Sequence, residues 1–110
     1  MKLTEMIEDY CRRAPTRLTP RQIAQVALSN HILVDDDCFI VYREFLDEIH
    51  ILYPYAARGK TMLPLYRQLE EKARKAGFRR IEVTTGRPKA VQRLFPDAKA
   101  VGITFVKELT

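Results

Sequence analysis

Residues 48–78 predict a strand, a short basic turn and a helix in direct succession. The segment begins with alternating apolar residues, continues through Arg-Gly-Lys-Thr at residues 58–61, and ends at Gly77. N–H groups at the start of a helix have no partner within the helix, and the helix dipole favours an anion there. The pattern therefore predicts a phosphate-binding turn in front of the helix.

An apolar stripe at helical spacing predicts a helix over residues 61–76, for which Thr61 is a candidate cap. The stripe consists of Met62, Leu65, Leu69 and Ala73. Gly77 predicts the end of this helix, and residues 79–85 predict a strand. A strand–helix–strand unit of this length implies a parallel crossover between the strands at 48–55 and 79–85.

Two helices are predicted ahead of the strands. Residues 4–13 have apolar residues at helical spacing, with Thr4 as the candidate N-cap. The second helix is predicted from residue 20 to about residue 30, because Thr19 and Gln22 form a capping box around Pro20.

The remaining segments predict the rest of a mixed sheet. Residues 31–34, 38–45 and 48–55 are joined by connections so short that they predict an antiparallel meander. A short helix is predicted at 88–95 and a final strand at 101–109. The predicted fold class is therefore α/β (α+β). We expect residues 1–110 to form one domain, with a helical part at 1–30 and the sheet at 31–110.

The formal net charge of +5 favours anionic partners such as a nucleotide cofactor, an acidic protein surface or nucleic acid. No run of basic residues alternates with aromatic ones, which argues against a dedicated nucleic-acid binder. No apolar run is long enough for a membrane span, and the charged N-terminus does not resemble a signal peptide. Cys11 and Cys38 are interpreted as reduced thiols, so we expect a cytoplasmic protein.

The order of these elements and the turn at residues 58–63 resemble the GNAT acyltransferase superfamily. The resemblance covers the chain from about residue 38 to its end and is clearest over 48–83. The family's loop pattern is Gln/Arg-x-x-Gly-x-Gly/Ala. Arg58 fills its first position, but Thr61 and Leu63 stand at its two small positions, and Pro64 removes one backbone donor. The small size resembles the reduced GNAT-like proteins that bacteriophages encode.

The resemblance implies that the chain binds acetyl-CoA, with the diphosphate at the basic turn. The implied cofactor-binding residues are Tyr53, Tyr55, Arg58, Gly59, Lys60, Thr61, Met62 and Leu63. A backbone N–H of Tyr53 or Tyr55 would polarise the thioester carbonyl, because Pro54 has no N–H. Arg87, Lys89 and Arg93 are either contacts for the adenosine phosphate end or plain surface residues.

The implied reaction also needs a base that deprotonates an amine. Glu48 and His50 are the first candidates, since they share one face of the predicted strand, and Glu44 is the third. Tyr53, implied as catalytic, is one candidate acid. The other two are Tyr55 and Tyr66, because Phe95 stands where many family members have an acid tyrosine.

Structural interpretations stand beside these roles. The turn at 58–60 is equally well interpreted as a solvated turn. Glu48 is also interpreted as an exposed charge and His50 as a half-buried residue of the sheet. The tyrosines are also interpreted as core residues. Asp35-Asp36-Asp37 falls far short of a calcium loop, so no metal site is predicted.

Three functions remain open. The first is an acetyl-CoA-dependent N-acetyltransferase acting on an amine, including one on a protein. The second is an inactive GNAT-like protein-interaction module, such as a phage protein that binds a host partner. The third is a basic nucleic-acid-associated module. Dimerisation through a sheet edge also stays open.

Overall fold

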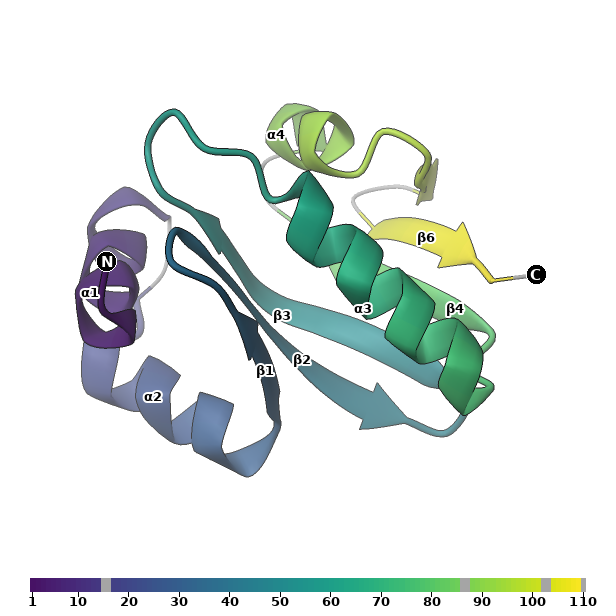
Figure 1. The fold of residues 1–110 in the computed structure, drawn as a ribbon, viewed down its shortest axis with the longest axis horizontal. Coiled ribbons are helices and arrows are strands. Elements are labelled where there is room, and N and C mark those ends of the chain that lie inside the picture. Colours follow the sequence, from purple (N-terminus) through teal and green to yellow (C-terminus); the bar gives the residue numbers. More distant parts are fainter. Residues whose placement is uncertain (15–16, 86–87, 102–103, 110) are drawn as a thin grey trace.

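The computed structural model describes residues 1–14, 17–85, 88–101 and 104–109. Its helices are α1 (Leu3–Arg13), α2 (Pro20–Ser29), α3 (Leu63–Ala76) and α4 (Pro88–Leu94). Its strands are β1 (His31–Val34), β2 (Cys38–Phe45), β3 (Glu48–Ala56), β4 (Arg80–Thr84), β5 (Lys99–Val101) and β6 (Thr104–Glu108). The strands form one six-stranded mixed sheet in the order β1-β2-β3-β4-β6-β5, and Figure 1 shows this fold.

The sheet has the predicted topology. β1, β2 and β3 pair antiparallel, which confirms the meander. β3 and β4 pair in parallel, with α3 as the crossover between them. β6 then pairs antiparallel with both β4 and β5. The mixed α/β class is therefore confirmed.

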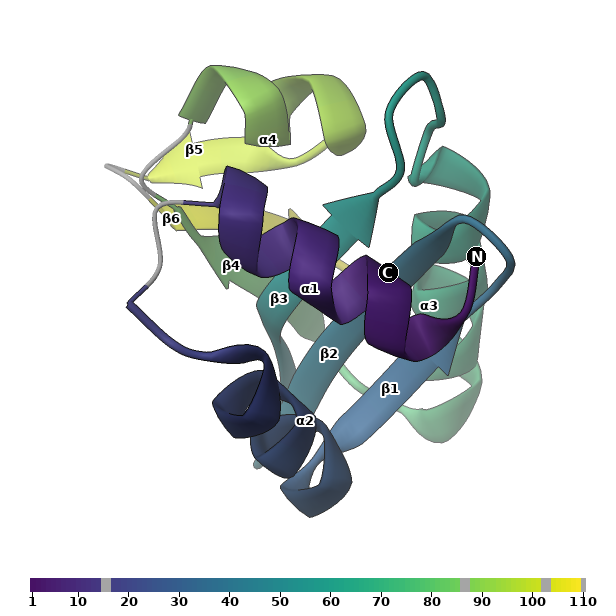
Figure 2. The ribbon, with the colours of Figure 1, turned by 90° about the vertical axis from the view of Figure 1, so that its left-hand side faces the viewer.

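The sheet separates two hydrophobic clusters. In one cluster, Met6, Ile7 and Ile23 of α1 and α2 pack on Phe39 and Val41 of β2. The other cluster joins the opposite face of the sheet to α3, α4 and the turn after α4. Its largest buried side chains are Tyr42, Tyr66 and Phe95, with Leu65 and Leu69 of α3. Figure 2 shows α1 and α2 in front of the sheet and α3 behind it.

Two helix starts differ from the prediction. α1 begins at Leu3 with Lys2 as its N-cap, so Thr4 lies inside the helix and does not cap it. α3 begins at Leu63 rather than at residue 61, with Met62 as its N-cap. Pro64 suits the first turn of a helix, because its missing N–H would have no intrahelical partner there.

The C-terminal strand also differs from the prediction. In place of one strand over 101–109, the structure has β5 and β6, and these two strands pair antiparallel. β5 is only three residues long, too short for an alternating pattern to appear in the sequence. The strand predicted at 48–55 and the helix predicted at 88–95 differ from β3 and α4 by one residue at one end, and the strand predicted at 79–85 differs from β4 by one residue at each end.

Local signals at two other helix ends are confirmed. The Thr19 side chain accepts a hydrogen bond from the Gln22 N–H, and the Gln22 side chain accepts one from the Thr19 N–H. Gly77 ends α3 in the left-handed conformation, with φ at 86°. Among the described helices, none is long and apolar enough to cross a membrane.

Candidate functional site

The candidate site begins where β3 and β4 part. The two strands pair only from Glu48 with Arg80 to Ile51 with Val83. β3 continues to Ala56, and in the described chain no strand pairs with it beyond Ile51 on the β4 side. One edge of β3 is therefore open next to the loop at residues 57–62.

A β-bulge lies at the same place. Val41 pairs with Tyr53 and Tyr42 pairs with Ile51, so Leu52 is the extra residue on β3. The bulge changes which residues face which side. Ile51 contributes to the cluster under α3, whereas Tyr53 and Tyr55 both contribute to the cluster under α1 and α2.

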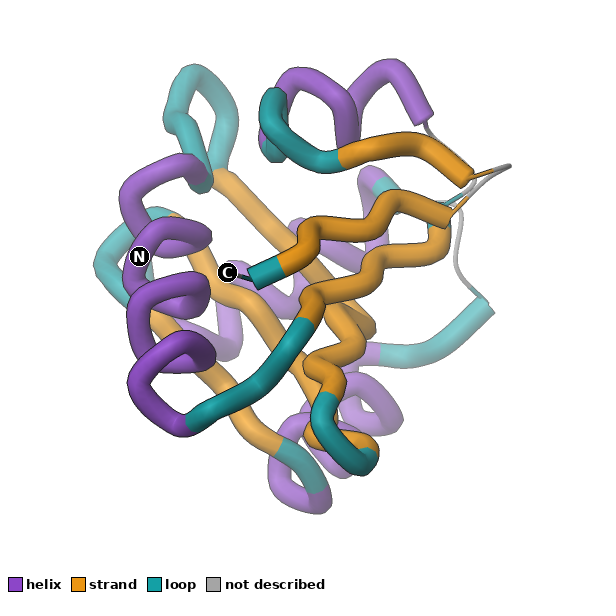
Figure 3. The backbone as a smooth tube through the Cα atoms, turned by 90° about the vertical axis from the view of Figure 1, so that its right-hand side faces the viewer, coloured by secondary structure: helices purple, strands orange, loops and turns teal. Residues whose placement is uncertain are grey.

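The 57–62 loop presents backbone donors. In this loop and the first turn of α3, the N–H groups of five residues have no hydrogen-bond partner among the described residues: Arg58, Gly59, Thr61, Met62 and Leu65. The Leu63 N–H donates to the Thr61 hydroxyl at 3.2 Å, and Pro64 has no N–H to offer. In the three ribbon and tube views the loop and α4 lie at the same end of the molecule (Figures 1, 2 and 3).

Gly59 shapes this loop. Its φ is +78°, a left-handed conformation that favours glycine, and a Cβ built there would meet nothing within 4 Å. The surface above Gly59 is therefore open. Free N–H groups and an open approach are what an anion such as a diphosphate requires.

Two cations, Arg58 and Lys60, lie in the loop, and they have different surroundings. Arg58 is exposed and makes no ion pair with any described residue. The Lys60 ammonium lies 3.8 Å from a carboxylate oxygen of Asp37, in the turn between β1 and β2. The Asp37 carbonyl also accepts a hydrogen bond from the Ala57 N–H at 2.8 Å, so this acidic turn is attached to the start of the loop.

The side chain of Tyr55 is buried and engaged. Its hydroxyl donates to Asp9 of α1 at 2.7 Å, and its ring stacks on Phe39. Burial, followed by the hydrogen bond to Asp9, raises the pKa of Tyr55 to about 12. The structure therefore gives the Tyr55 side chain a packing role, and only its backbone is left for a cofactor.

Tyr53 is half-buried on the same side of the sheet. Its ring makes an edge contact with Tyr10 of α1, with the centroids 5.7 Å apart. Burial raises the pKa of Tyr53. The phenol therefore stays protonated at neutral pH, the state that a general acid needs.

Glu48 and His50 do lie together, half-buried on one face of β3. The His50 Nε2 atom lies 2.8 Å from a Glu48 carboxylate oxygen and 3.5 Å from one of Glu82. Glu82 is the register partner of His50 across the parallel β3–β4 pair. Arg43 donates to the His50 Nδ1 atom at 3.3 Å, which leaves Nε2 as the protonated nitrogen facing the two carboxylates.

Sequence reasoning missed Glu82, although a signal was present. Ile49-His50-Ile51 and Ile81-Glu82-Val83 have the same apolar–polar–apolar pattern. Aligning these triplets in the predicted parallel crossover places Glu82 beside His50. The same alignment places Arg80 beside Glu48. In the structure, the Arg80 guanidinium lies 3.7 Å from Glu48 and 3.5 Å from Glu82.

Glu44 does not join this group. It lies on the other face of the sheet, where its carboxylate is 3.7 Å from His31, and the His31 ring stacks on Tyr42. Tyr66 is buried against Phe95, with the ring centroids 4.3 Å apart. Burial is the largest cause of the raised pKa of Tyr66.

The basic residues near α4 are only partly described. Lys89 and Arg93 are exposed on α4. Arg87 lies outside the described residues. The structure therefore leaves their predicted contact with an adenosine phosphate untested.

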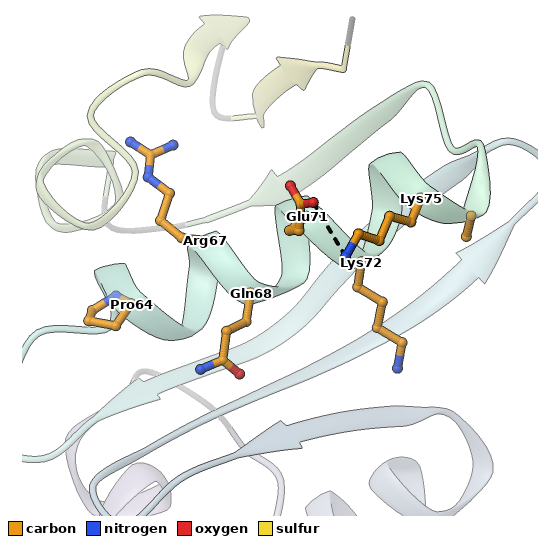
Figure 4. Close-up of a pocket in the computed structure, with 7 residues that line it drawn as sticks. Pro64, Arg67, Gln68, Glu71, Lys72 and Lys75 are labelled. Carbon is orange, nitrogen blue, oxygen red and sulfur yellow. Dashed lines mark ion pairs between the residues drawn. The ribbon is translucent and has the colours of Figure 1, made fainter.

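A shallow hollow lies elsewhere, on the outer side of α3 (Figure 4). It is lined by Pro64, Arg67, Gln68, Glu71, Lys72, Lys75 and Ala76, all of one helix. Glu71 and Lys75 form an ion pair across it at 3.6 Å. Because all of these lining residues belong to α3, and no other described element contributes to the lining, the hollow is the outer surface of this helix and not a candidate site.

Solved structures similar to this one share its fold. The IAA acetyltransferase from Bacillus cereus ATCC 14579 matches with a TM-score of 0.73 and 17% identity, covering 98% of this chain and 93% of that one. The ribosomal-protein-S18-alanine N-acetyltransferase from Escherichia coli matches with a TM-score of 0.72 and 13% identity, and the match covers 100% of this chain and 91% of that one. The PaiA N-acetyltransferase from Thermoplasma acidophilum, in complex with coenzyme A, matches with a TM-score of 0.59 and 19% identity, and the match covers 98% of this chain and 79% of that one.

No family model matches this chain, and no curated protein sequence does. The structural matches include proteins described as GNAT acetyltransferases. At these low identities the likeness shows the fold, and the chain has the GNAT fold that its sequence predicted from about residue 38 to its end.

Proposed function

We propose that this chain is a small N-acetyltransferase that transfers an acetyl group from acetyl-CoA to an amine, including an amine on a protein. The observation that carries the proposal is the set of unpartnered N–H groups in the 57–62 loop and at the start of α3. They lie beside the opening between β3 and β4, and they suit a diphosphate. The coenzyme A bound to the similarly folded PaiA protein supports a cofactor of this type.

Each part of the proposed site has a role. Arg58 and Lys60 supply positive charge for the diphosphate. A backbone N–H at Tyr53, next to the bulge, polarises the carbonyl that is attacked. Glu48 accepts the proton of the attacking amine, and His50 holds its carboxylate in place. The cofactor, when bound, supplies the activated acetyl thioester. The free thiols Cys11 and Cys38 support a cytoplasmic setting.

The second candidate function is an inactive GNAT-like module that binds a partner protein. Three departures in the site favour it. The Leu63 N–H is already engaged, Pro64 offers no donor, and Phe95 has no hydroxyl at the position where the resemblance implies that many family members have an acid tyrosine. Cofactor binding separates the two candidates, because a module of this kind has no need to retain it.

The test is calorimetric titration of the purified chain with acetyl-CoA, with coenzyme A and ADP as further ligands. We expect saturable binding that weakens at least tenfold in the Arg58→Ala/Lys60→Ala double variant. A lost charged hydrogen bond costs roughly 1.5–3 kcal/mol, and the pairing of Lys60 with Asp37 makes Arg58 the larger contributor.

A matched control removes the same charge elsewhere. Lys72→Ala/Lys75→Ala takes two cations from the outer side of α3 (Figure 4) and should leave the affinity unchanged. An equal loss in both double variants would mean that net charge alone attracts the cofactor. If the folded wild-type chain does not bind acetyl-CoA, the enzyme proposal fails, and the interaction module takes its place. Steeply salt-dependent binding to DNA or RNA would favour the nucleic-acid alternative.

A further inference from the structure

Three side chains with metal-ligand chemistry meet on the face of the sheet that bears His50. Glu48, His50 and Glu82 each offer one ligand atom, and these three atoms all lie within 4.8 Å of one another. Two come from β3 and one from β4, and the parallel register places His50 directly beside Glu82. The side chains are 18–27% exposed, so they are held by the sheet and still open to solvent.

We propose that Glu48, His50 and Glu82 form a binding site for a divalent transition-metal ion of the zinc type. Zinc accepts imidazole nitrogen and carboxylate oxygen at about 2.0–2.2 Å, so tetrahedral ligand atoms lie about 3.3 Å apart. The two distances from His50 Nε2, 2.8 and 3.5 Å, bracket that separation. An imidazole in the set favours zinc, copper or nickel over magnesium or calcium.

Only small movements on the surface are needed. His50 must carry its proton on Nδ1, so the exposed Arg43 gives up its 3.3 Å bond to that atom and keeps its position over the Phe45 ring. Arg80 gives up its long contacts to Glu48 and Glu82 but keeps Glu108, which lies closer at 2.7 Å. With three protein ligands, a fourth position stays open to water.

The sheet provides the rigidity that such a site requires. Ile49, Ile51, Ile81 and Val83 flank the three ligands on the same strands and are buried on the other face. The ligands therefore project from a backbone that is fixed by pairing and by the core. The metal site and the proposed base use the same two residues, and a metal-bound Glu48 could not accept a proton, so occupancy by a metal and the base role of Glu48 exclude one another. Metal binding is measured without substrate or cofactor, so its outcome is independent of the test for acetyl-CoA binding.

The test is titration of the untagged, metal-free full chain with zinc chloride by calorimetry. We expect one ion per chain with micromolar affinity, and a loss of at least tenfold in both His50→Ala and Glu82→Gln. The matched control is His31→Ala, which removes the exposed histidine that lies 3.7 Å from Glu44 and should leave the affinity unchanged. Circular dichroism of each variant checks that it is folded. If His50→Ala fails to fold, Glu82→Gln decides, since it keeps the size of the side chain.

Cobalt substitution identifies the ligands independently. Cobalt(II) bound by the three proposed groups should give visible d–d bands without the near-ultraviolet charge-transfer band of a thiolate ligand. That outcome excludes Cys11 and Cys38 as the source of binding. The proposal is overturned if zinc does not bind, if binding survives in both His50→Ala and Glu82→Gln, or if the thiolate band dominates.

Discussion

Asp97 ties the turn after α4 to two other elements. Its carboxylate accepts hydrogen bonds from Arg67 of α3 at 2.8 Å and from Lys107 of β6 at 3.0 Å. The Arg67 hydrogen bond, as the largest cause, lowers the pKa of Asp97 from 3.8 to about 2. The ionised form is therefore more stable in the folded chain than in the unfolded one.

The sign of the pH effect follows from this lowered pKa. The stabilisation is fully present above pH 3.8, the ordinary value, and is lost as the pH falls towards about 2. Asp97→Asn should lower the free energy of unfolding at pH 6 by about 1 kcal/mol, a figure discounted for solvent screening. Urea unfolding at pH 6 and at pH 2.5 measures this loss. The difference in the free energy of unfolding between wild type and Asp97→Asn should be smaller at pH 2.5 than at pH 6. An equal difference at both pH values would contradict the role given to Asp97.

Among the elements, the pairing of the long strands and the helix ends with complete local signals were predictable, whereas the bulge in β3 and the short strand β5 were not. The Thr19 box and Gly77 are visible in the sequence, and both mark the helix ends that the structure has. By contrast, nothing in the sequence shows that Leu52 is the extra residue of a bulge, because a bulge exists only relative to a partner strand. β5 is likewise defined by its pairing with β6.

The same distinction holds for the candidate site. The loop with Arg58 and Gly59 was predictable, because a strand, a glycine and a helix start are local features. Glu82 was not identified, because its proximity to His50 depends on strand register, and only an alignment of the two apolar–polar–apolar triplets would have given that register. The packing role of the Tyr55 hydroxyl also depends on a distant residue, Asp9 of α1.

The end of α3 gives a test at the scale of one element. Gly77 and Phe78 donate their N–H groups to the Arg74 and Ala73 carbonyls, a bond pattern that requires the positive φ of Gly77. Gly77→Ala should lower the free energy of unfolding by about 1 kcal/mol, the cost of a left-handed conformation for an L-residue.

The cause of that loss would be backbone strain, since a Cβ at Gly77 meets nothing within 4 Å. Denaturant unfolding measures it, with Lys75→Ala as the control on the same exposed end of α3. The control should cost no more than about 0.5 kcal/mol, as surface substitutions usually do. Equal stability of Gly77→Ala and the wild type would mean that α3 ends differently in solution.

At the scale of the whole molecule, β2 joins the two hydrophobic clusters. Phe39 and Val41 contribute to the cluster under α1 and α2, and Ile40 and Tyr42 contribute to the one under α3. All four are at most 1% exposed. Loss of packing in either cluster therefore destabilises β2, and β2 also supplies core residues to the other cluster. We therefore expect the helical N-terminal part and the sheet to unfold together.

Two core variants test this coupling. Ile23→Ala in α2 and Leu69→Ala in α3 each remove a fully buried side chain, one from each cluster. Each should cost about 2–5 kcal/mol and lower the midpoint of one common transition. Far-ultraviolet circular dichroism and tyrosine fluorescence follow the transition by two probes. Leu28→Ala, which truncates an 87% exposed leucine of α2, should leave the midpoint nearly unchanged. If Ile23→Ala instead separates an early transition from a later one at the wild-type midpoint, α1 and α2 unfold independently, and β2 does not couple the two clusters.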